Sequence, residues 1–216
     1  MWEKEYKKNK YYWGLKPSPI LEKYINKIPK GKSLDIGAGE GRNSLFLAKN
    51  GFEVTAIDEI KQGLDKIKKL AKKYDLTIKT KLCSINNLKL KKEDYSLIIS
   101  VSTIDFLKKN EIDNILDKIK NSLKLNGFIY LSIFSTKDPL FKLIKEKKLK
   151  EVEENTFYLP KFKTYRHFFT KTEIKEKFKD FNIILLKQKE ILDTGHNKPH
   201  YHNIIEFLAQ KKKATE

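Results

Sequence analysis

Apolar and polar residues along the chain alternate between short apolar runs and longer stretches in which apolar residues recur every three or four positions. The short runs predict strands at 33–37, 53–57, 77–82, 95–101, 128–134, 182–187 and 203–209. The longer stretches predict helices at 21–28, 42–50, 60–74, 111–123 and 170–180. Runs 95–101 and 128–134 are apolar throughout, as expected for strands that are covered on both faces.

This alternation of strands and helices predicts a three-layer α/β domain with a mainly parallel sheet. Residues 137–169 show no clear period, so we expect a less regular insertion at about 137–170, on the substrate side of the sheet. The chain then divides into an N-terminal arm and helix (1–30), a core (31–210) and a tail (211–216).

Length and composition narrow the class of protein. A chain of 216 residues with 39% hydrophobic residues is large and apolar enough for one or two folded domains. The sequence contains no apolar run of the ~20 residues that cross a membrane, and the N-terminus lacks the apolar core of a secretory signal. With Cys83 as the single cysteine, an internal disulfide and a cysteine-based zinc site are excluded. We therefore expect a soluble cytoplasmic protein.

The charge balance is strongly basic, with 46 Lys and Arg against 28 Asp and Glu, a net charge of +18. Such a surplus is typical of nucleic-acid binding. However, Arg42 and Arg166 are the only arginines, and arginine makes the bidentate contacts to guanine and phosphate. The lysines are spread along the whole chain. We therefore expect a small-molecule partner rather than a nucleic acid.

A glycine-rich turn follows the first predicted strand. Gly37, Gly39 and Gly41 allow a tight turn and a close approach of a ligand to the backbone, and the next helix begins with unpaired N–H groups. The second strand ends at Asp58, about 20 residues after the first glycine, where an acid can bind ribose hydroxyls. The arrangement predicts a nucleotide site.

Two nucleotide cofactors share this geometry. Nicotinamide dinucleotides favour Gly-x-Gly-x-x-Gly, whereas the spacing here is Gly-x-Gly-x-Gly. Asp35, just before the glycines, would repel a pyrophosphate and attract a sulfonium and an ammonium group. Both features favour S-adenosyl-L-methionine (SAM), with a dinucleotide and a ligand-free turn as the alternatives.

The block LDIGAGEGRNSLFLAKNGFEVTAIDE resembles motifs I and II of class I SAM-dependent methyltransferases, and more narrowly the tellurite-resistance (TehB-like) branch. The narrower resemblance is carried by GEGRNS at 39–44, YWGLKPS at 12–18 and a His-x-x-x-His-x-His stretch before the last strand. It implies a Rossmann-like fold with a mainly parallel seven-stranded sheet and an antiparallel last strand. It also implies methyl transfer that releases S-adenosyl-L-homocysteine.

The resemblance further implies a set of cofactor-binding residues. They are Asp35, Gly37, Ala38, Gly39, Asn43, Asp58, Glu59, Ser84, Ile85, Val101, Ser102, Tyr12 and Trp13. The glycine turn would line the methionine part of SAM, and Asp58 would hold the ribose. Ser84 stands where the family commonly has an acid for the adenine amino group. Tyr12 and Trp13 resemble a lid within residues 1–30, with ordinary packing of the arm as the alternative.

The acceptor is restricted by what the sequence lacks. No Asn/Asp-Pro-Pro-Tyr follows 95–101, which disfavours methylation of exocyclic base amines, and Cys83 lies near the expected adenine, which disfavours cytosine-C5 chemistry. We expect transfer by SN2 displacement to a small soft nucleophile or metalloid oxyanion, of the tellurite, selenite or thiol type. The alternatives are an RNA or protein methyltransferase, and a SAM- or metal-binding module without turnover.

Three histidines, His196, His200 and His202, lie before the last strand. His200 and His202 are two positions apart, so they share one face of an extended strand. A hairpin loop before an antiparallel last strand lies at the carboxyl ends of the parallel strands, where ligands bind. These histidines are thus interpreted as structural, as acid–base or positioning groups, or as ligands of a divalent transition metal together with Asp193, Glu206 or water.

Arg166 and His167 lie in the predicted insertion. We expect Arg166, with His167, to bind an anionic acceptor such as an oxyanion or a carboxylate. A surface ion pair is the alternative for Arg166.

Overall fold

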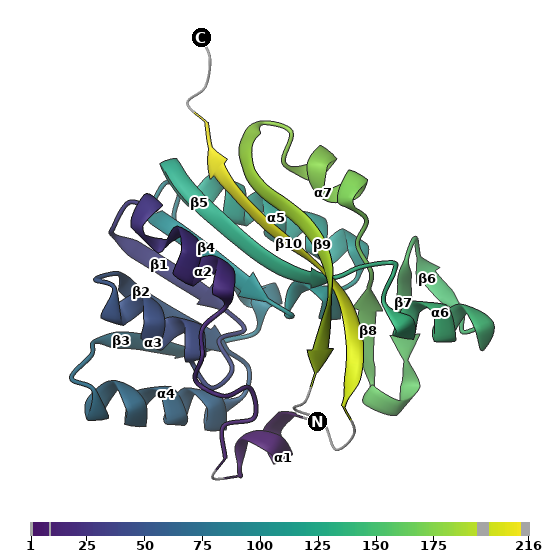
Figure 1. Cartoon of the computed structure of the whole chain (residues 1–216), viewed down its shortest axis with the longest axis horizontal. Coiled ribbons are helices and arrows are strands. Elements are labelled where there is room, and N and C mark those ends of the chain that lie inside the picture. The colour runs from purple at the N-terminus through teal and green to yellow at the C-terminus, as the bar shows by residue number, and fades with distance from the viewer. Residues whose placement is uncertain (1, 9, 194–198, 213–216) are drawn as a thin grey trace.

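The computed structural model describes residues 2–8, 10–193 and 199–212. Within these residues, seven strands form one sheet in the order β3-β2-β1-β4-β5-β10-β9 (Figure 1). The strands are β1 (Lys32–Ile36), β2 (Glu53–Asp58), β3 (Ile78–Leu82), β4 (Tyr95–Val101), β5 (Leu123–Phe134), β9 (Phe181–Asp193) and β10 (His200–Lys211). β10 pairs antiparallel with β5 and β9, while the pairs from β3 to β5 are parallel. The predicted fold is confirmed.

Helices cover both faces of this sheet. The helices of the described residues are α1 (Trp2–Tyr6), α2 (Pro19–Tyr24), α3 (Arg42–Lys49), α4 (Lys61–Lys73), α5 (Lys109–Ser122), α6 (Pro139–Glu146) and α7 (Lys171–Lys177), with single 3-10 turns η1 (Ile25–Lys27), η2 (Ile85–Asn87), η3 (Ile104–Phe106) and η4 (Pro160–Phe162). Of these, α1 packs against α4, and α6 and η4 belong to the smaller sheet beside the main one (Figure 1). Leu97 and Ile99 of β4 pack in a cluster with α2 and α3, whereas Ile98 packs in a cluster with α5 and α7. This alternation buries both faces of β4.

Local signals in the sequence set the helix ends. α3 begins after Gly41, which has a positive φ of 89°, and its C-terminus is followed by Gly51 at φ 80°. α6 begins after Asp138, whose side chain accepts a hydrogen bond from Leu140 N at 2.8 Å, with Pro139 in the first turn. The Asp138 side chain is therefore fixed at the end of α6 that faces β10.

The prediction of a less regular stretch at 137–169 is wrong. In the described part of the chain, α6 is followed by β6 (Glu151–Glu153), β7 (Thr156–Leu159) and β8 (Thr164–His167), which form a three-stranded antiparallel sheet. Ile144, Phe157, Leu159 and Phe168 are its buried core. Strands of three or four residues are too short to produce a recognisable alternation. The subdomain joins the main sheet through hydrogen bonds between 134–136 and Phe169 (Figure 1).

The last two strands are longer than predicted, and β10 extends into the predicted tail. As a result, His200 and His202 lie on β10 itself rather than in a loop, and Asp193 is directly opposite His200 in the register. α1 was not predicted. Among the residues that the structure describes, no helix is both long and apolar enough to span a bilayer.

Candidate functional site

The glycine turn joins β1 to α3 at the carboxyl edge of the sheet. The N–H groups of Gly37 and Ala38 both donate to Ile57 O, at 2.9 Å each. Gly37 has φ 70°, and a Cβ there would lie 2.1 Å from Thr103 Oγ1, so any larger residue is excluded. Since Thr103 follows β4, the turn lies between β1 and β4. That is where the strand order reverses, the usual ligand position in such sheets.

Asp58 lies beside this turn, at the end of β2. Its Oδ2 accepts a hydrogen bond from Gly39 N and its Oδ1 accepts one from Ile60 N, both at 2.8 Å. Burial raises the pKa of Asp58, and these backbone hydrogen bonds oppose that rise. A carboxylate has about four lone-pair directions, so two hydrogen bonds leave acceptor capacity for further donors. The side chain is held in place and can still accept from ribose hydroxyls.

The predicted adenine side of the site adjoins Asp58. Cys83 N donates to Asp58 O at 3.0 Å, which holds the ends of β2 and β3 together. Ser84 is half-buried and Ile85 is buried beneath it, whereas Glu59 is exposed. Ser84 and Ile85 therefore offer a partly apolar surface next to Asp58.

Two predicted cofactor residues lie behind the turn. The Asp35 side chain is buried, and its Oδ2 accepts a hydrogen bond from Ser44 Oγ at 2.6 Å. Burial raises its pKa to about 6, with the Ser44 bond opposing the rise. Asn43 is also buried, and its Oδ1 accepts a hydrogen bond from Ser18 N at 2.9 Å. Asp35 thus joins β1 to α3, and Asn43 joins α3 to the segment before α2.

Val101 and Ser102 lie at the end of β4, on the other side of the glycine turn. Ser102 has φ 49°, and its N–H donates to Ser132 O of β5 at 2.8 Å. Thr103 Oγ1 donates to Val101 O at 3.0 Å. These bonds fix the backbone beside Gly37, where the resemblance places the sulfonium.

The N-terminal arm is tied down over the glycine turn. Glu40 lies within the turn, and its Oε2 accepts a hydrogen bond from Tyr12 N at 2.6 Å. Its Oε1 forms an ion pair with Lys66 Nζ, also at 2.6 Å. Lys66 also donates to Lys8 O at 2.7 Å and Lys10 O at 3.1 Å. Glu40 and Lys66 were not predicted as site residues, because their partners are distant in sequence.

Aromatic rings fill the space between this arm and the turn. The ring centroids of Tyr12 and Trp13 are 4.9 Å apart, and Trp2 lies 5.4 Å from Trp13 and 5.6 Å from Tyr12. Tyr6 is buried, and its hydroxyl lies 2.9 Å from the point where a Cβ on Gly39 would be. Burial raises the pKa of Tyr6, and Asp58 and Glu40 add to that rise. Tyr6 and Trp2, missed in the sequence, cover the glycine turn together with the predicted pair.

A second cluster lies at the same edge of the sheet, between β9, β10 and α6. His202 Nε2 is 3.0 Å from His200 Nε2 and 3.6 Å from Asp193 Oδ2, and His202 Nδ1 is 3.0 Å from Asp138 Oδ2. Burial raises the pKa of Tyr12 in the arm, and the charge of Asp193 adds to that rise. The structure therefore brings His200, His202 and Asp193 together. His196 lies outside the described residues, and Glu206 pairs instead with Lys189 at 2.8 Å.

Arg166 lies beside the histidine cluster and is not in a surface ion pair. Its Nη1 is 3.2 Å from Asp105 Oδ2, with side chains 12% and 0% exposed. The guanidinium carbon lies 4.0 Å from the ring centroid of Phe106 and 4.4 Å from that of Phe134. The Phe134 ring also contacts His202 edge-on at 4.7 Å. Burial raises the pKa of Asp105 to about 6, and the charge of Arg166 opposes that rise.

His167, the other predicted residue of the insertion, is fully buried. Its Nδ1 is 2.8 Å from Thr156 Oγ1, and its Nε2 is 3.2 Å from Glu173 Oε1. Both ring nitrogens are therefore occupied in joining β7 to α7. The structure gives His167 a packing role, and we do not carry it forward as a catalytic group.

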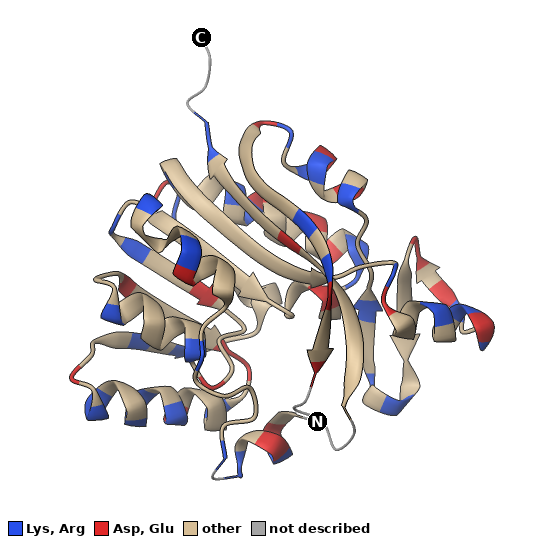
Figure 2. Ribbon diagram, viewed as in Figure 1, with Lys and Arg blue, Asp and Glu red and all other residues tan. Residues whose placement is uncertain are grey.

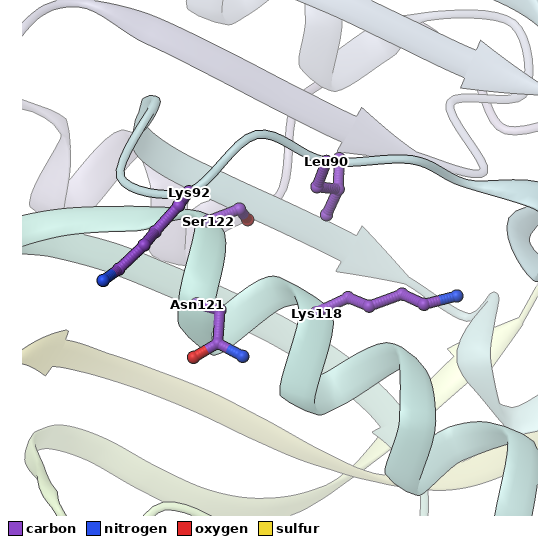
Figure 3. A pocket seen from close by; sticks show the side chains of 5 residues that line it. All are labelled: Leu90, Lys92, Lys118, Asn121 and Ser122. Atoms are coloured by element: carbon purple, nitrogen blue, oxygen red, sulfur yellow. The ribbon is translucent and has the colours of Figure 1, made fainter.

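A hollow of about 440 Å³ elsewhere on the surface lies far from this chemistry. It is lined by Leu90, Lys92, Lys118, Asn121 and Ser122 (Figure 3). These residues precede β4 and β5, at the amino ends of the parallel strands. Because ligands of such sheets bind at the carboxyl ends, we assign it no part in the site.

Charged residues are spread over many elements of the fold. In the view of Figure 2, Lys and Arg occur on nearly every helix and are interspersed with Asp and Glu.

Comparison with known proteins assigns the chain to a family. The sequence profile described as "Tellurite resistance protein TehB" matches residues 1–206 of the 216-residue chain. The chain belongs to the TehB family. This membership confirms the predicted assignment to the TehB-like branch of class I SAM-dependent methyltransferases.

Individual relatives agree with the family assignment. The probable SAM-dependent methyltransferase TehB of Haemophilus influenzae (strain ATCC 51907 / DSM 11121 / KW20 / Rd) is 30% identical over 134 residues, which are 59% of this chain and 46% of that protein. The ubiquinone biosynthesis O-methyltransferase of Rickettsia typhi is 32% identical over 179 residues, 80% of this chain and 69% of that protein. The chain spans about half the length of the TehB relative that it matches.

Solved structures of the same fold confirm the architecture. The crystal structure of TehB from Haemophilus influenzae superposes with a TM-score of 0.70 at 22% identity, covering 98% of this chain and 66% of that chain. A SAM-dependent methyltransferase from Methanosarcina mazei superposes with a TM-score of 0.73 at 22% identity, covering 92% of this chain and 99% of that chain. At this identity the likeness shows the fold alone.

Proposed function

We propose that the protein transfers a methyl group from SAM to a small soft nucleophile or a metalloid oxyanion. One observation carries the proposal: the glycine turn with Asp58 and the cluster of Arg166, His200 and His202 lie at the same carboxyl edge of one sheet. A cofactor site and an acceptor site that share an edge are what an in-line transfer requires. The TehB and O-methyltransferase relatives support the same class of reaction.

The residues present fit SAM. Gly37 and Gly39 have positive φ angles and form the tight turn beside Asp58, and Asp58 keeps acceptor capacity for ribose hydroxyls. Ser84 and Ile85 would border the adenine, and Val101 and Ser102 the sulfonium. When bound, SAM supplies an electrophilic methyl group and leaves as S-adenosyl-L-homocysteine.

The arm would close this site from one side. Glu40 and Lys66 bind the backbone at Lys8, Lys10 and Tyr12. The aromatic rings of Tyr6, Tyr12 and Trp13 would then cover the turn. Aromatic rings exclude water, and a ring near a sulfonium adds a cation–π attraction of about 1 kcal/mol. The lid role predicted for residues 1–30 is therefore part of the proposal.

The acceptor would bind between Arg166 and His202. Asp105 takes up one N–H of the guanidinium, which has five, and Arg166 Nε has no hydrogen-bond partner among the described residues. Phe106 and Phe134 stack on the guanidinium and leave its edges for an anion. An acceptor with one negative charge and a soft donor atom matches this combination of a cation and apolar walls.

The test is a panel of acceptors in which release of S-adenosyl-L-homocysteine is measured. It contains a thiol, selenite, tellurite, a phenol and a short RNA. We expect turnover with one of the first three, with kcat/KM lowered at least tenfold by Arg166→Lys and unchanged by Lys142→Ala, a substitution on the exposed face of α6. Turnover of RNA that falls steeply with salt would instead favour a nucleic-acid methyltransferase. SAM binding without turnover on any acceptor would favour a binding module.

A further inference from the structure

We propose that Asp193, His200 and His202 bind one divalent transition-metal ion of the Zn²⁺ class. Their ligand atoms all lie within 4.8 Å of one another. Imidazole and carboxylate are the ligand types of Zn²⁺ and its neighbours, and two histidines with one carboxylate form a common catalytic set. Binding of the ion itself does not depend on the proposed methyl transfer.

The sheet register explains why the three side chains converge. Asp193 is paired directly with His200 across the β9–β10 hairpin, so both project from the same face. His202 is two residues further along β10 and returns to that face. The site is therefore built on two hydrogen-bonded strands, a more rigid support than a loop.

The distances suit a common ion. His202 Nε2 is 3.0 Å from His200 Nε2 and 3.6 Å from Asp193 Oδ2. Two ligand atoms bound tetrahedrally to one Zn²⁺ at about 2.0–2.1 Å are roughly 3.3 Å apart, which lies between these two distances. The whole set lies within 4.8 Å, so ion binding would draw these side chains closer together.

A second carboxylate orients His202. Asp138 Oδ2 is 3.0 Å from His202 Nδ1 and accepts Asn203 N at 2.9 Å, while its Oδ1 accepts Leu140 N at 2.8 Å. Asp138 is 1% exposed and thereby fixed on three sides. An imidazole that donates from Nδ1 to a carboxylate presents the lone pair of Nε2 to the cluster. This carboxylate–histidine arrangement is typical of metal ligands.

The alternative is a hydrogen bond between the two rings, in which His200 Nε2–H donates to His202 Nε2. Both interpretations explain the 3.0 Å separation, but they differ in the role of Asp193. In the metal interpretation the Asp193 carboxylate is one of the ligands, whereas in the other it lies 3.6 Å from His202 Nε2 without taking part in the hydrogen bond between the rings. Replacing Asp193 thus separates the two.

The three ligands that lie among the described residues leave at least one position of a tetrahedral ion for a further ligand. A thiol acceptor that took that position would release its proton to solvent, and the bound thiolate would be a better nucleophile than the neutral thiol. This role rests on the proposed function, whereas the ion can be detected without any methyl acceptor or SAM.

The experiment measures Zn²⁺ binding to the tag-free full chain by competition with a chromophoric chelator, and by the rise in Tm that Zn²⁺ causes. Asp193→Asn is compared with Glu190→Gln, which removes an exposed carboxylate from the same strand. We expect one ion per chain for the wild type and Glu190→Gln, at least tenfold weaker binding for Asp193→Asn, and 10- to 100-fold weaker binding for Asp138→Asn.

Each outcome decides the proposal. A stoichiometric site that is lost in Asp193→Asn, which still unfolds cooperatively without Zn²⁺, supports it. It is overturned if the wild type shows no stoichiometric site, or if Asp193→Asn and Glu190→Gln bind Zn²⁺ equally. If Zn²⁺ binds as expected and no acceptor is methylated, the proposed function fails and the metal site stands.

Discussion

Glu40 and Lys66 form an ion pair of 2.6 Å whose side chains are only 2% and 14% exposed. The remaining Glu40 oxygen binds Tyr12 N, and Lys66 also binds two carbonyl groups of residues 8–10. One pair of charges therefore holds Lys8, Lys10 and Tyr12 of the N-terminal arm against α4 and the glycine turn. Folding of the core and closure of the arm are coupled through these two side chains.

Lys66→Met should lower the free energy of unfolding because it leaves the Glu40 carboxylate buried without its cation. Loss of one partner of a fully buried pair costs about 3–5 kcal/mol, and partial exposure of Lys66 reduces this to roughly 2–3 kcal/mol. Urea denaturation measures the change. Lys68→Met, on the exposed face of the same helix, should change stability by less than about 0.5 kcal/mol. The double variant Glu40→Gln/Lys66→Met should recover part of the lost free energy of unfolding. Equal destabilisation by Lys66→Met and Lys68→Met would contradict the role of the ion pair.

Deleting residues 1–16 should weaken SAM binding at least tenfold without unfolding the core. The deletion removes the aromatic rings above the turn, whereas β1 and the elements after it keep their own hydrophobic clusters. Calorimetric titration with SAM measures the change, and circular dichroism monitors the core. Removal of 213–216 is the control for truncation. If the shortened protein bound SAM as the full chain does, the arm would only be packed against the core.

Asp58→Ala should raise the Kd for SAM by tenfold or more. The substitution removes an acceptor of charge-assisted hydrogen bonds, each worth about 1.5–3 kcal/mol, and it also frees Gly39 N. Asp58→Asn retains an acceptor oxygen, so its Kd for SAM should lie between those of the wild type and Asp58→Ala. Glu53→Gln, at the other end of β2, should bind SAM normally. Unchanged SAM affinity in Asp58→Ala would remove the assignment of this residue to the ribose.

Removing the charge of Asp35 and removing the charge of Asp105 should change the free energy of unfolding in opposite directions. The pKa of each is raised to about 6 by burial, but Asp35 is bonded to the neutral Ser44 and Asp105 to the buried Arg166. At pH 7.5, Asp35→Asn should therefore stabilise the protein, by up to about 2–3 kcal/mol. Asp105→Asn should destabilise it, because Arg166 is left as an unpaired buried cation.

The raised pKa of Asp35 determines how the stability difference between Asp35→Asn and the wild type changes with pH. Between about pH 4 and 6 the folded protein holds a proton on Asp35 that the unfolded chain releases, so this group stabilises the fold as the pH falls. The gain in the free energy of unfolding of Asp35→Asn over the wild type should thus be largest above pH 6 and disappear near pH 4. Thermal unfolding at pH 7.5 and 4.5 checks this, and an advantage that grows on acidification would refute it.

The main sheet could be predicted from the sequence because its strands are apolar runs and its turns contain the glycines that the geometry requires. Gly37 and Asp58 were identified in the same way, since their chemistry is local to one βα turn. The small sheet of residues 151–167 could not be predicted, because strands of three or four residues carry little periodicity.

The residues missed at the site act through partners that are distant in sequence. Asp138 contacts His202 across 64 positions, and Lys66 contacts Glu40 across 26. In the sequence, Asp138 resembles only a helix cap before Pro139, and Lys66 is one lysine among many. Conversely, the sequence could not show that His167 is enclosed, because that depends on Thr156 and Glu173.

The final prediction concerns the histidine pair. His200→Ala and His202→Ala should lower kcat/KM by about 100-fold or more, as expected for loss of an acid–base group or a metal ligand. SAM affinity should change by less than about 1 kcal/mol. β10 is separated from β1 by β4 and β5, so at about 4.8 Å per strand the histidines are roughly 14 Å away across the sheet from the glycine turn.

Tyr201→Ala is the matched control for these two variants. Tyr201 lies between the histidines on β10, but it points to the opposite face and is 53% exposed. It should keep wild-type turnover and wild-type SAM binding. Steady-state kinetics on the acceptor found in the panel, with calorimetry for SAM, distinguishes the outcomes. A loss of SAM binding in both histidine variants would show that they support the fold of the cofactor site. Wild-type turnover in both would leave the histidines with packing alone, because neither an acid–base group nor a metal ligand can be removed from a reaction without slowing it.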